Sequence, residues 1–371
     1  MLKVATLFSG IGAPEWALKR LGIPHECVLA CDNGDVDISG EIDVQKEREK
    51  AASLKTFKEE KEYVDSLYQA HSHKRNFVKE SYLANYPDFK EENYFLDVNL
   101  LNGIPLRGKV DLLIGGSPCQ AFSVVGFQQG LKDNRGNLFF EFLRLVDEIK
   151  PKIFIYENVT GIYSKKNLEN WERMWQSMND LGYKLWKGSL NAKDFGIPQI
   201  RNRLFVVGFL DRNVNPNLFN PQTKELVGYM QDFLIESTEE GGVRYDSQGG
   251  ITFSRVPGTI NPKYFLTPAV YKYVTTPGTK NWKTHIETDR PIARTLLSTM
   301  GNHHRAGVDN YVTVDGKLRA LSERECLRLM GFTDDFRIVV STQQAYKQAG
   351  NSMVVDVIMS LIRELQLLNL I

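Results

Sequence analysis

Short apolar runs alternate with segments of helical periodicity over roughly the first 210 residues. Apolar runs of about four to eight residues, bounded by turn residues, are typical of strands buried in a parallel sheet, and apolar residues three and four apart indicate covering helices. The predicted strands are Val4–Phe8, Cys27–Cys31, Val110–Ile114, Ile153–Tyr156 and Leu204–Phe209, and the predicted helices are Glu15–Leu21, Phe139–Ile149 and Leu168–Leu181. This pattern predicts an α/β fold with a doubly wound, mostly parallel sheet.

Two stretches depart from the alternation. Residues 36–75 are rich in Lys and Glu at helical spacing, which predicts a solvated helical excursion, with a partner contact through Lys and Arg as the alternative. Residues 211–318 are rich in Gly, Pro, Thr, Asn and aromatics, with β-type runs at Val270–Thr276 and Asn310–Val314. We therefore expect a first domain over 1–210 and a smaller, loop-rich domain over 211–318.

Helical patterning returns near the end of the chain, at Ser322–Met330 and Ser352–Leu368. The last helix is expected to pack back on the first domain. Residues 319–371 are accordingly predicted to return to the first domain.

Composition narrows the class of protein. The 371 residues are 42% hydrophobic and can bury a large core, but no apolar run is long enough to span a bilayer. The amino terminus resembles a strand and not a signal peptide, and no membrane partner is expected. The cysteines, which are Cys27, Cys31, Cys119 and Cys326, have neither metal-ligand spacing nor a disulfide pattern. We expect them to be reduced, and the protein therefore to be cytoplasmic. Since the net charge is only +1, any nucleic-acid surface must be a local patch.

A candidate nucleophile and a candidate acid follow two of the predicted strands. Cys119 lies in the run Ser117–Ser123, directly after a strand and two glycines, and Glu157 and Asn158 end another strand. Open α/β sheets present catalytic groups at the carboxyl ends of their strands. This placement favours an enzyme that uses covalent catalysis.

A glycine-containing loop marks a candidate cofactor site. Residues Phe8–Gly12 follow the first strand and precede a helix, and Asp32 ends the second strand twenty residues later. Glycines let the backbone approach a ligand, and an acid at this spacing can bind ribose hydroxyls. The pattern fits a dinucleotide or S-adenosylmethionine. The third glycine of the dinucleotide motif is absent, since Gly12 is followed by Ala13, Pro14 and Glu15, which disfavours NAD.

These segments together resemble the cytosine-5 DNA methyltransferase family over nearly the whole chain. The matching motifs occur in family order: Phe8-Ser9-Gly10-Ile11-Gly12, Asp32, Asp97-Val98, Pro118-Cys119-Gln120, Glu157-Asn158-Val159, Gln199-Ile200-Arg201-Asn202-Arg203, Arg319–Phe332 and Gly350-Asn351-Ser352. The chain departs from the family at Asp32, where Glu is usual, at Asn33, where a bulky residue is common, and at Met330, where Gln is common. The excursion over 36–75 is also longer than the family leads us to expect.

The resemblance implies S-adenosylmethionine as cofactor and a covalent mechanism. The thiolate of Cys119 would add to carbon 6 of cytosine, Glu157 would serve ring nitrogen 3, Arg203 would hold the ring carbonyl, and Arg201 would organise the site. The residues implied for cofactor binding are Phe8, Ser9, Gly10, Gly12, Asp32, Asn33, Asp97, Val98, Pro118, Leu138, Asn351 and Ser352.

The implied substrate is double-stranded DNA, read by a target-recognition domain over 211–318. A base inside a duplex must be flipped out to be reached, and the glycine-containing segment 124–137 is expected to close over it. The implied DNA contacts are Gln120, Ser123, Arg135, Thr295 and Leu296. We expect a monomer that serves restriction-modification or phage protection, with any cognate restriction endonuclease acting separately.

Three other functions compete with this interpretation. An RNA cytosine-5 methyltransferase of the tRNA-modifying branch shares the catalytic core, although the sizeable second domain favours DNA. A catalytically silent DNA-binding relative is disfavoured by the intact Cys119, Glu157 and Arg203. A NAD-dependent oxidoreductase leaves the motifs around Cys119 and Glu157 unexplained.

Overall fold

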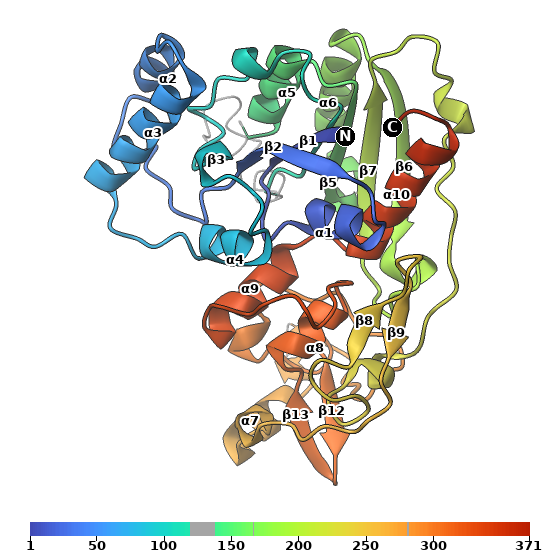
Figure 1. The fold of residues 1–371 in the computed structure, drawn as a ribbon. Coiled ribbons are helices and arrows are strands. Elements are labelled where there is room, and N and C mark those ends of the chain that lie inside the picture. Colours follow the sequence, from blue (N-terminus) through green and yellow to red (C-terminus); the bar gives the residue numbers. More distant parts are fainter. Residues whose placement is uncertain (119–137, 166, 280–281) are drawn as a thin grey trace.

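The computed structural model describes residues 1–118, 138–165, 167–279 and 282–371, and a seven-stranded sheet forms its centre (Figure 1). The strands lie in the order β3-β2-β1-β4-β5-β7-β6, and only β7 runs antiparallel to its neighbours in this sheet. Their bounds are β1 Leu2–Leu7, β2 His25–Cys31, β3 Tyr94–Phe95, β4 Leu112–Gly115, β5 Ile153–Val159, β6 Lys184–Asn191 and β7 Asn202–Phe209. The predicted doubly wound, mostly parallel sheet is confirmed.

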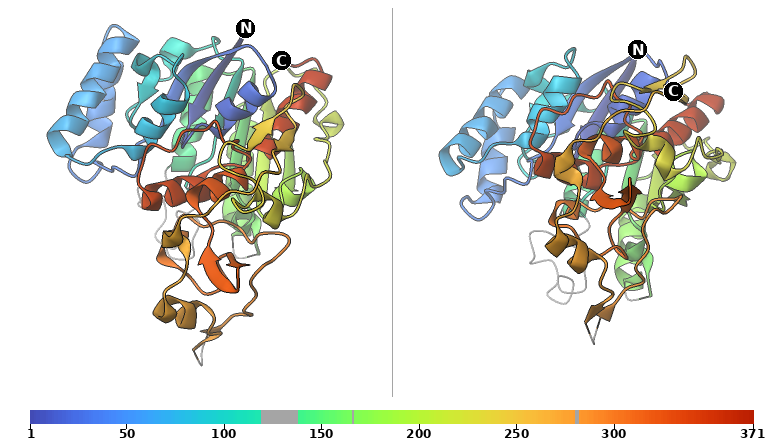
Figure 2. Two further views of the ribbon diagram at one scale, coloured as in Figure 1. Left: turned by 60° about the horizontal axis from the view of Figure 1, so that its bottom comes forward. Right: turned by 90° about the horizontal axis from the view of Figure 1, so that it is seen from below.

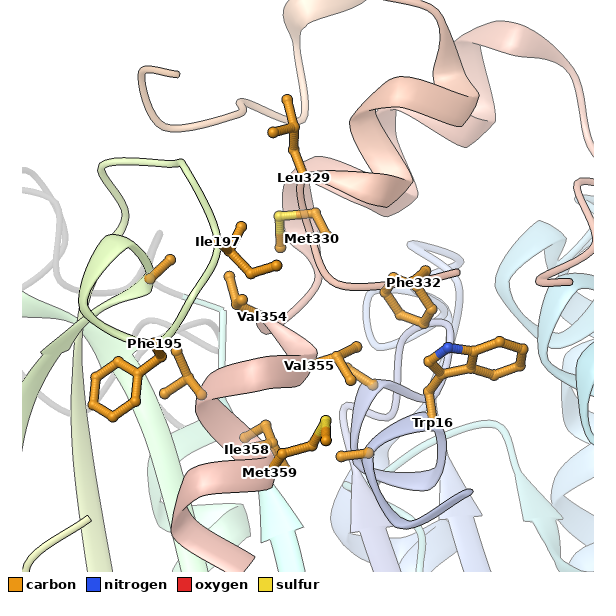
Figure 3. Packing of buried hydrophobic residues seen from close by; sticks show 14 of the residues in the cluster. Trp16, Phe195, Ile197, Leu329, Met330, Phe332, Val354, Val355, Ile358 and Met359 are labelled. Atoms are coloured by element: carbon orange, nitrogen blue, oxygen red, sulfur yellow. The ribbon is translucent and has the colours of Figure 1, made fainter. Parts of the chain in front are cut away.

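Helices cover both faces of the sheet. Successive residues of a strand point to opposite faces, so neighbouring residues pack against different helices. Val4 of β1 packs in one large apolar cluster with α1 (Ala13–Arg20) and α10 (Val355–Leu367). Its neighbour Ala5 packs in another cluster with α5 (Leu138–Ile149) and α6 (Leu168–Asp180). Figure 3 shows the first cluster, where Trp16 of α1 lies beside Phe332 and Val355. The last helix therefore packs on the first part of the chain, as predicted.

The excursion folds as two helices, α2 (Val44–Ala52) and α3 (Phe57–His71), beside β3 at the sheet edge (Figure 1). Thr56 is the N-cap residue of α3. Its hydroxyl accepts the Glu59 amide and forms a capping box with Glu59 that starts the helix. The inner face is not solvated: a small apolar cluster that includes Val64 and Tyr68 is buried there. The helical prediction is confirmed, but the excursion is part of the packed fold.

The remaining elements lie between residues 77 and 351. They are α4 (Phe77–Asn85), α7 (Pro268–Val274), α8 (Glu323–Arg328), α9 (Thr342–Asn351) and the strand pairs β8 (Val243–Tyr245) with β9 (Ile251–Phe253), β10 (Gly278–Thr279) with β11 (Trp282–Lys283), and β12 (Tyr311–Val314) with β13 (Lys317–Ala320). Figure 2 shows α7 and β10–β13 projecting from the sheet-containing body.

The run Val270–Thr276, expected as β structure, is mostly helical and lies in α7. Thr267 caps this helix by accepting the Val270 amide, and Pro268 occupies its first turn. These start signals outweigh the β-branched and aromatic residues that favoured a strand.

The loop-rich part has only a small core of its own, formed by Val274, Ala306, Tyr311 and Leu318. Phe219, Met230, Val243 and Ile251 instead join the large cluster beneath α1 and α10. Part of 211–318 is therefore continuous with the main core.

Neither a membrane-spanning helix nor a metal-binding cluster is present among residues 1–118, 138–165, 167–279 and 282–371. No helix there is long and apolar enough to cross a membrane. No group of three or more His, Cys, Asp or Glu in the same ranges is arranged to hold a metal ion. Cys27, Cys31 and Cys326 are free thiols.

Glu60 makes the docking of α3 sensitive to pH. Its buried carboxylate accepts the Asn102 amide at 2.7 Å, and burial raises its pKa to about 7, with Glu148 adding to the rise and Arg144 opposing it. A raised pKa favours the protonated form in the folded state. Its contribution to stability is therefore complete below pH ~4.5 and is lost as pH rises through about 7.

We predict that Glu60→Gln removes much of this pH dependence and stabilises the excursion at pH 8 by up to ~3 kcal/mol. Hydrogen exchange of residues 44–71 at pH 5.5 and 8 measures the effect. Glu62→Gln is the matched control, because Glu62 is exposed on the same helix. Equal pH dependence in Glu60→Gln and wild type would contradict the prediction.

Candidate active site

Strand register brings the predicted site residues to one edge of the sheet. Leu7 pairs with both Cys31 and Gly115, so β1, β2 and β4 end level with one another. The pairs Cys31–Phe95 and Gly115–Tyr156 extend the same edge to β3 and β5. The residues that follow at this edge are Phe8, Asp32, Asp97, Ser117 and Glu157.

The loop after β1 adopts an unusual backbone. Phe8, Gly10 and Gly12 have φ values of 54°, 53° and 79°. Gly12 also needs its lack of a side chain, because a Cβ there would lie 2.4 Å from the Tyr86 ring. The buried hydroxyl of Ser9 accepts the last amide of β2 at 2.9 Å. Both packing and hydrogen bonding therefore fix this loop beside the end of β2.

Asp32 ties that loop to the next one. Its two carboxylate oxygens accept the Gly10 amide at 2.9 Å and the Gly34 amide at 2.8 Å. Burial raises the pKa of Asp32, while these two hydrogen bonds oppose the rise. Asn33 accepts the Asp35 amide at 3.0 Å and so stabilises the turn itself. Each Asp32 oxygen keeps acceptor capacity for a hydroxyl group.

Asp97 follows β3 and is almost fully buried. One carboxylate oxygen accepts the amide and the side-chain amide of Asn99 at 2.9 and 2.8 Å, and the other accepts the Tyr68 hydroxyl at 3.1 Å. Burial raises the pKa of Asp97, and these hydrogen bonds oppose it. The Val98 carbonyl is held by Arg144 at 2.7 Å.

Three further predicted cofactor residues lie at this side of the sheet. Leu138 is half-buried at the start of α5, Asn351 is exposed at the end of α9, and Ser352 is buried next to it. Hydrogen bonding of Gln348 to Ser81 at 2.9 Å fixes α9 against α4.

These groups fit an adenosyl cofactor. Asp32 offers acceptors for ribose hydroxyls and Asp97 offers one for an amino group. A Cβ at Gly10 would meet no atom within 4 Å, so the loop after β1 is open on that side. The donor and acceptor set therefore suits S-adenosylmethionine, with Asp32 in place of the usual Glu.

Glu157 and Arg203 form a shielded ion pair where the end of β5 meets the start of β7. Because β7 runs antiparallel to β5, its first residues lie beside the end of β5, and Arg203 pairs with Val159. Its Nε lies 3.1 Å from Glu157 Oε1, with the side chains 18% and 14% exposed. Burial raises the pKa of Glu157, and the positive charges of Arg203 and Arg201 oppose the rise. A carboxyl group in such surroundings is a candidate for proton transfer.

The chain leading to Cys119 is fixed beside Glu157. Asn158 donates from its side-chain amide to the Ser117 carbonyl at 3.2 Å and to the Tyr156 hydroxyl at 2.7 Å. A Cβ on Gly116 would lie 2.9 Å from both the carbonyl and a carboxylate oxygen of Glu157. The exposed Pro118 is the last described residue before the gap. The predicted residues Cys119, Gln120, Ser123 and Arg135, and the segment 124–137, lie outside the described residues.

Arg201 differs from Arg203 in what it contacts. It is 4% exposed and donates to the carbonyls of Leu296, Gly350 and Ser352 at 3.0, 2.9 and 2.9 Å. Its guanidinium therefore joins the end of α9 to the segment at 296, which agrees with an organising role.

Thr295 and Leu296 are also held by their backbone surroundings. The Thr295 hydroxyl donates to the Ile200 carbonyl at 2.6 Å, and the Leu296 amide donates to Gln199 Oε1 at 3.0 Å. The Leu296 side chain is 2% exposed and belongs to the main core, so in this conformation it does not offer a surface to DNA. Thr295 is half-buried and remains the accessible member of the pair.

Two residues that the sequence motifs do not include, Asn76 and Tyr68, also contact the predicted site residues. Asn76 donates to the Asp32 carbonyl at 2.9 Å and caps α4, and Tyr68 binds Asp97. Asn76 carries a sequence signal as a capping residue before a helix. The hydroxyl contact of Tyr68 carries none, because it joins segments 29 residues apart.

Comparison with known proteins identifies the family. The sequence pattern of the C-5 cytosine-specific DNA methylase family matches residues 68–367. The chain is 37% identical over 249 residues to the Type II methyltransferase M.HhaI of Haemophilus parahaemolyticus, covering 67% of this chain and 73% of that protein. It is 30% identical over 388 aligned positions to M2.ScrFI of Lactococcus lactis subsp. cremoris, covering 98% and 99%.

A solved structure of the S. pombe Dnmt2 methyltransferase has the same fold, with a TM-score of 0.66, 20% identity and full coverage of both chains. At that identity the likeness concerns the fold alone. The sequence matches carry the assignment: the chain belongs to the C-5 cytosine-specific DNA methylases and is a DNA (cytosine-5-)-methyltransferase, with S-adenosylmethionine as methyl donor.

Proposed function

We propose that this enzyme transfers a methyl group from S-adenosylmethionine to carbon 5 of a cytosine that is flipped out of a specific double-stranded DNA sequence. The shielded Glu157–Arg203 pair beside the chain leading to Cys119 is the observation that carries the proposal. A relative matched over nearly its full length is a Type II methyltransferase, which supports a role in restriction-modification or phage protection. We propose that the enzyme works as a cytoplasmic monomer, separately from any cognate endonuclease.

In the proposed reaction, the Cys119 thiolate forms a bond to carbon 6 of the ring, and electron density moves toward carbon 5. Glu157 holds a proton at ring nitrogen 3, for which burial has raised its pKa. Arg203 binds the ring carbonyl. S-Adenosylmethionine, when bound, supplies an electrophilic methyl group on a sulfonium. Loss of the carbon 5 proton and expulsion of the Cys119 thiolate then restore the aromatic ring.

Residues 211–318 are proposed as the target-recognition domain. Exposed Tyr271, Lys272 and Tyr273 lie on α7, and the Arg305 guanidinium stacks over the Tyr273 ring at 4.6 Å. Cations and aromatic rings together suit contact with phosphates and bases. Thr295 is proposed as a DNA contact from the same part of the chain, together with Gln120, Ser123 and Arg135 on the segment that includes Cys119.

We predict that plasmid DNA from cells expressing this chain contains bisulfite-resistant cytosines in one sequence context, and that Cys119→Ala abolishes them, since no bond to carbon 6 can form. Bisulfite sequencing measures both. Absence of resistant cytosines from a folded protein that binds S-adenosylmethionine would contradict the DNA substrate. Methylation of tRNA in a parallel assay would then favour the RNA alternative.

Glu157→Gln is predicted to lower kcat by about 10²- to 10⁴-fold, because the amide cannot pass a proton to ring nitrogen 3. Activity of the wild type should fall as pH rises through the pKa of Glu157, since the protonated form is the active one. Arg203→Ala removes the largest influence that lowers this pKa. The alkaline limb of its residual activity should therefore move to higher pH. A shift to lower pH in single-turnover pH profiles would contradict the proposed role of Glu157.

The two arginines should differ in their effect on stability. Arg201→Ala leaves three buried carbonyls without this donor, each costing about 1–3 kcal/mol, so the free energy of unfolding should fall by ~3 kcal/mol or more. Arg203→Ala should lower activity with a much smaller loss of stability. Urea denaturation of both variants measures the contrast, and equal losses would refute it.

A further inference from the structure

Helices α2 and α3 of the excursion hold the loop that carries Asp97 through hydrogen bonds. From α2, Arg48 donates to the Asn99 carbonyl, and from α3, Glu60 accepts the Asn102 amide at 2.7 Å. Tyr68, near the end of α3, donates to Asp97 at 3.1 Å. Figure 1 shows both helices beside β3, just before this loop. Three polar contacts from an insertion therefore fall within six consecutive residues, 97–102.

Apolar packing fixes the Tyr68 ring. Tyr68 is 7% exposed and belongs to an apolar cluster with Val36, Val64 and Leu100. Val36 follows Asp32 in the loop after β2, and Leu100 follows Asp97 in the loop after β3. The Tyr68 hydroxyl is also within donating distance of the Val36 carbonyl, at 3.2 Å, so the Val36 carbonyl and Asp97 share its one proton. This one side chain thus contacts both acid-bearing loops.

The contacts leave a specific acceptor free on Asp97. A carboxylate has about four lone-pair positions. Within the described part of the chain, the amide and side chain of Asn99 use two positions on Oδ1. The Tyr68 hydroxyl uses one on Oδ2. One position on Oδ2 remains, which matches one N–H of an exocyclic amino group.

We propose that Tyr68 is a positioning residue for the cofactor, whose hydroxyl orients the Asp97 carboxylate so that Oδ2 accepts the 6-amino group of adenine. The excursion is thereby part of the cofactor pocket and not a separate appendage. This inference rests on the proposed function, in which S-adenosylmethionine binds at this edge of the sheet. It adds a cofactor-positioning residue from helices that the sequence motifs leave out.

Binding of S-adenosylhomocysteine, measured by calorimetry, tests the inference. Tyr68→Phe removes the hydroxyl that bonds Asp97 and the Val36 carbonyl but keeps the ring, so affinity should fall roughly tenfold. For the analogue with hydrogen in place of the 6-amino group, the same variant should lose about twofold or less. Tyr63→Phe is the matched control, because Tyr63 lies on the same helix and its hydroxyl donates to Glu47 instead. Its affinities should equal those of the wild type.

A double-variant cycle separates orientation from general packing. In the Asp97→Asn background, Tyr68→Phe should cause no further loss of affinity. Wild-type hydrogen exchange provides a readout that does not depend on how the variants fold: S-adenosylhomocysteine should slow exchange in residues 97–102 and in the last turns of α3, and the analogue should not slow it in α3.

These measurements distinguish a failure of the Tyr68 positioning role from a failure of cofactor binding at this edge of the sheet. If the wild type binds S-adenosylhomocysteine but Tyr68→Phe binds it equally well, or loses affinity equally for both ligands, the positioning role is refuted. Unchanged exchange in α3 on binding refutes it as well. If the wild type binds neither ligand, the proposed cofactor role of this edge fails first, and this inference fails with it.

Discussion

Buried guanidinium groups that satisfy carbonyls from distant segments are the constraint on which this site depends. Arg201 binds carbonyls at 296, 350 and 352, and Arg20 binds the Gly249 and Gly331 carbonyls together with Asp356. An arginine can serve several partners because its planar head carries five donors and stays charged. Without these donors, each buried carbonyl would carry the cost of an unmade hydrogen bond. The late segments of the chain are thereby fixed on the first part of the chain.

Close backbone packing reinforces the link at Arg201. A Cβ on Gly350 would lie 2.3 Å from the backbone of both Leu297 and Ser298. The end of α9 and the segment at 297 can approach this closely only because residue 350 is glycine. Ser352 is held next to them through Arg201. The segment 296–298, which lies in the proposed recognition domain, and the segment 350–352, which carries proposed cofactor residues, are therefore held together by direct contacts.

The sequence predicted most of what periodicity and motifs can encode. The five long apolar runs became β1, β2, β4, β5 and β7, but β6 was missed because its residues alternate between exposed and half-buried with little apolar content. β3 was missed because it has only two residues. Proximity of Glu157 to Arg203 could be inferred only from family motifs, since it arises from the antiparallel pairing of β5 with β7. The contacts of Leu296 and Tyr68 depend on packing between segments far apart in sequence.

The excursion shows why charge-rich composition alone misjudges an insertion. Its outer residues are exposed, yet Glu60 and Tyr68 are buried and both bind the loop after β3. Lengthening a loop costs little conformational entropy, growing only with the logarithm of its length. The larger cost is the burial of polar groups such as Glu60, whose pKa is raised to about 7. In a purely peripheral insertion the acid would remain exposed to water and the cost of burying it would not arise. Burial of an acid against the Asp97 loop therefore indicates that the excursion is integrated with the loop after β3.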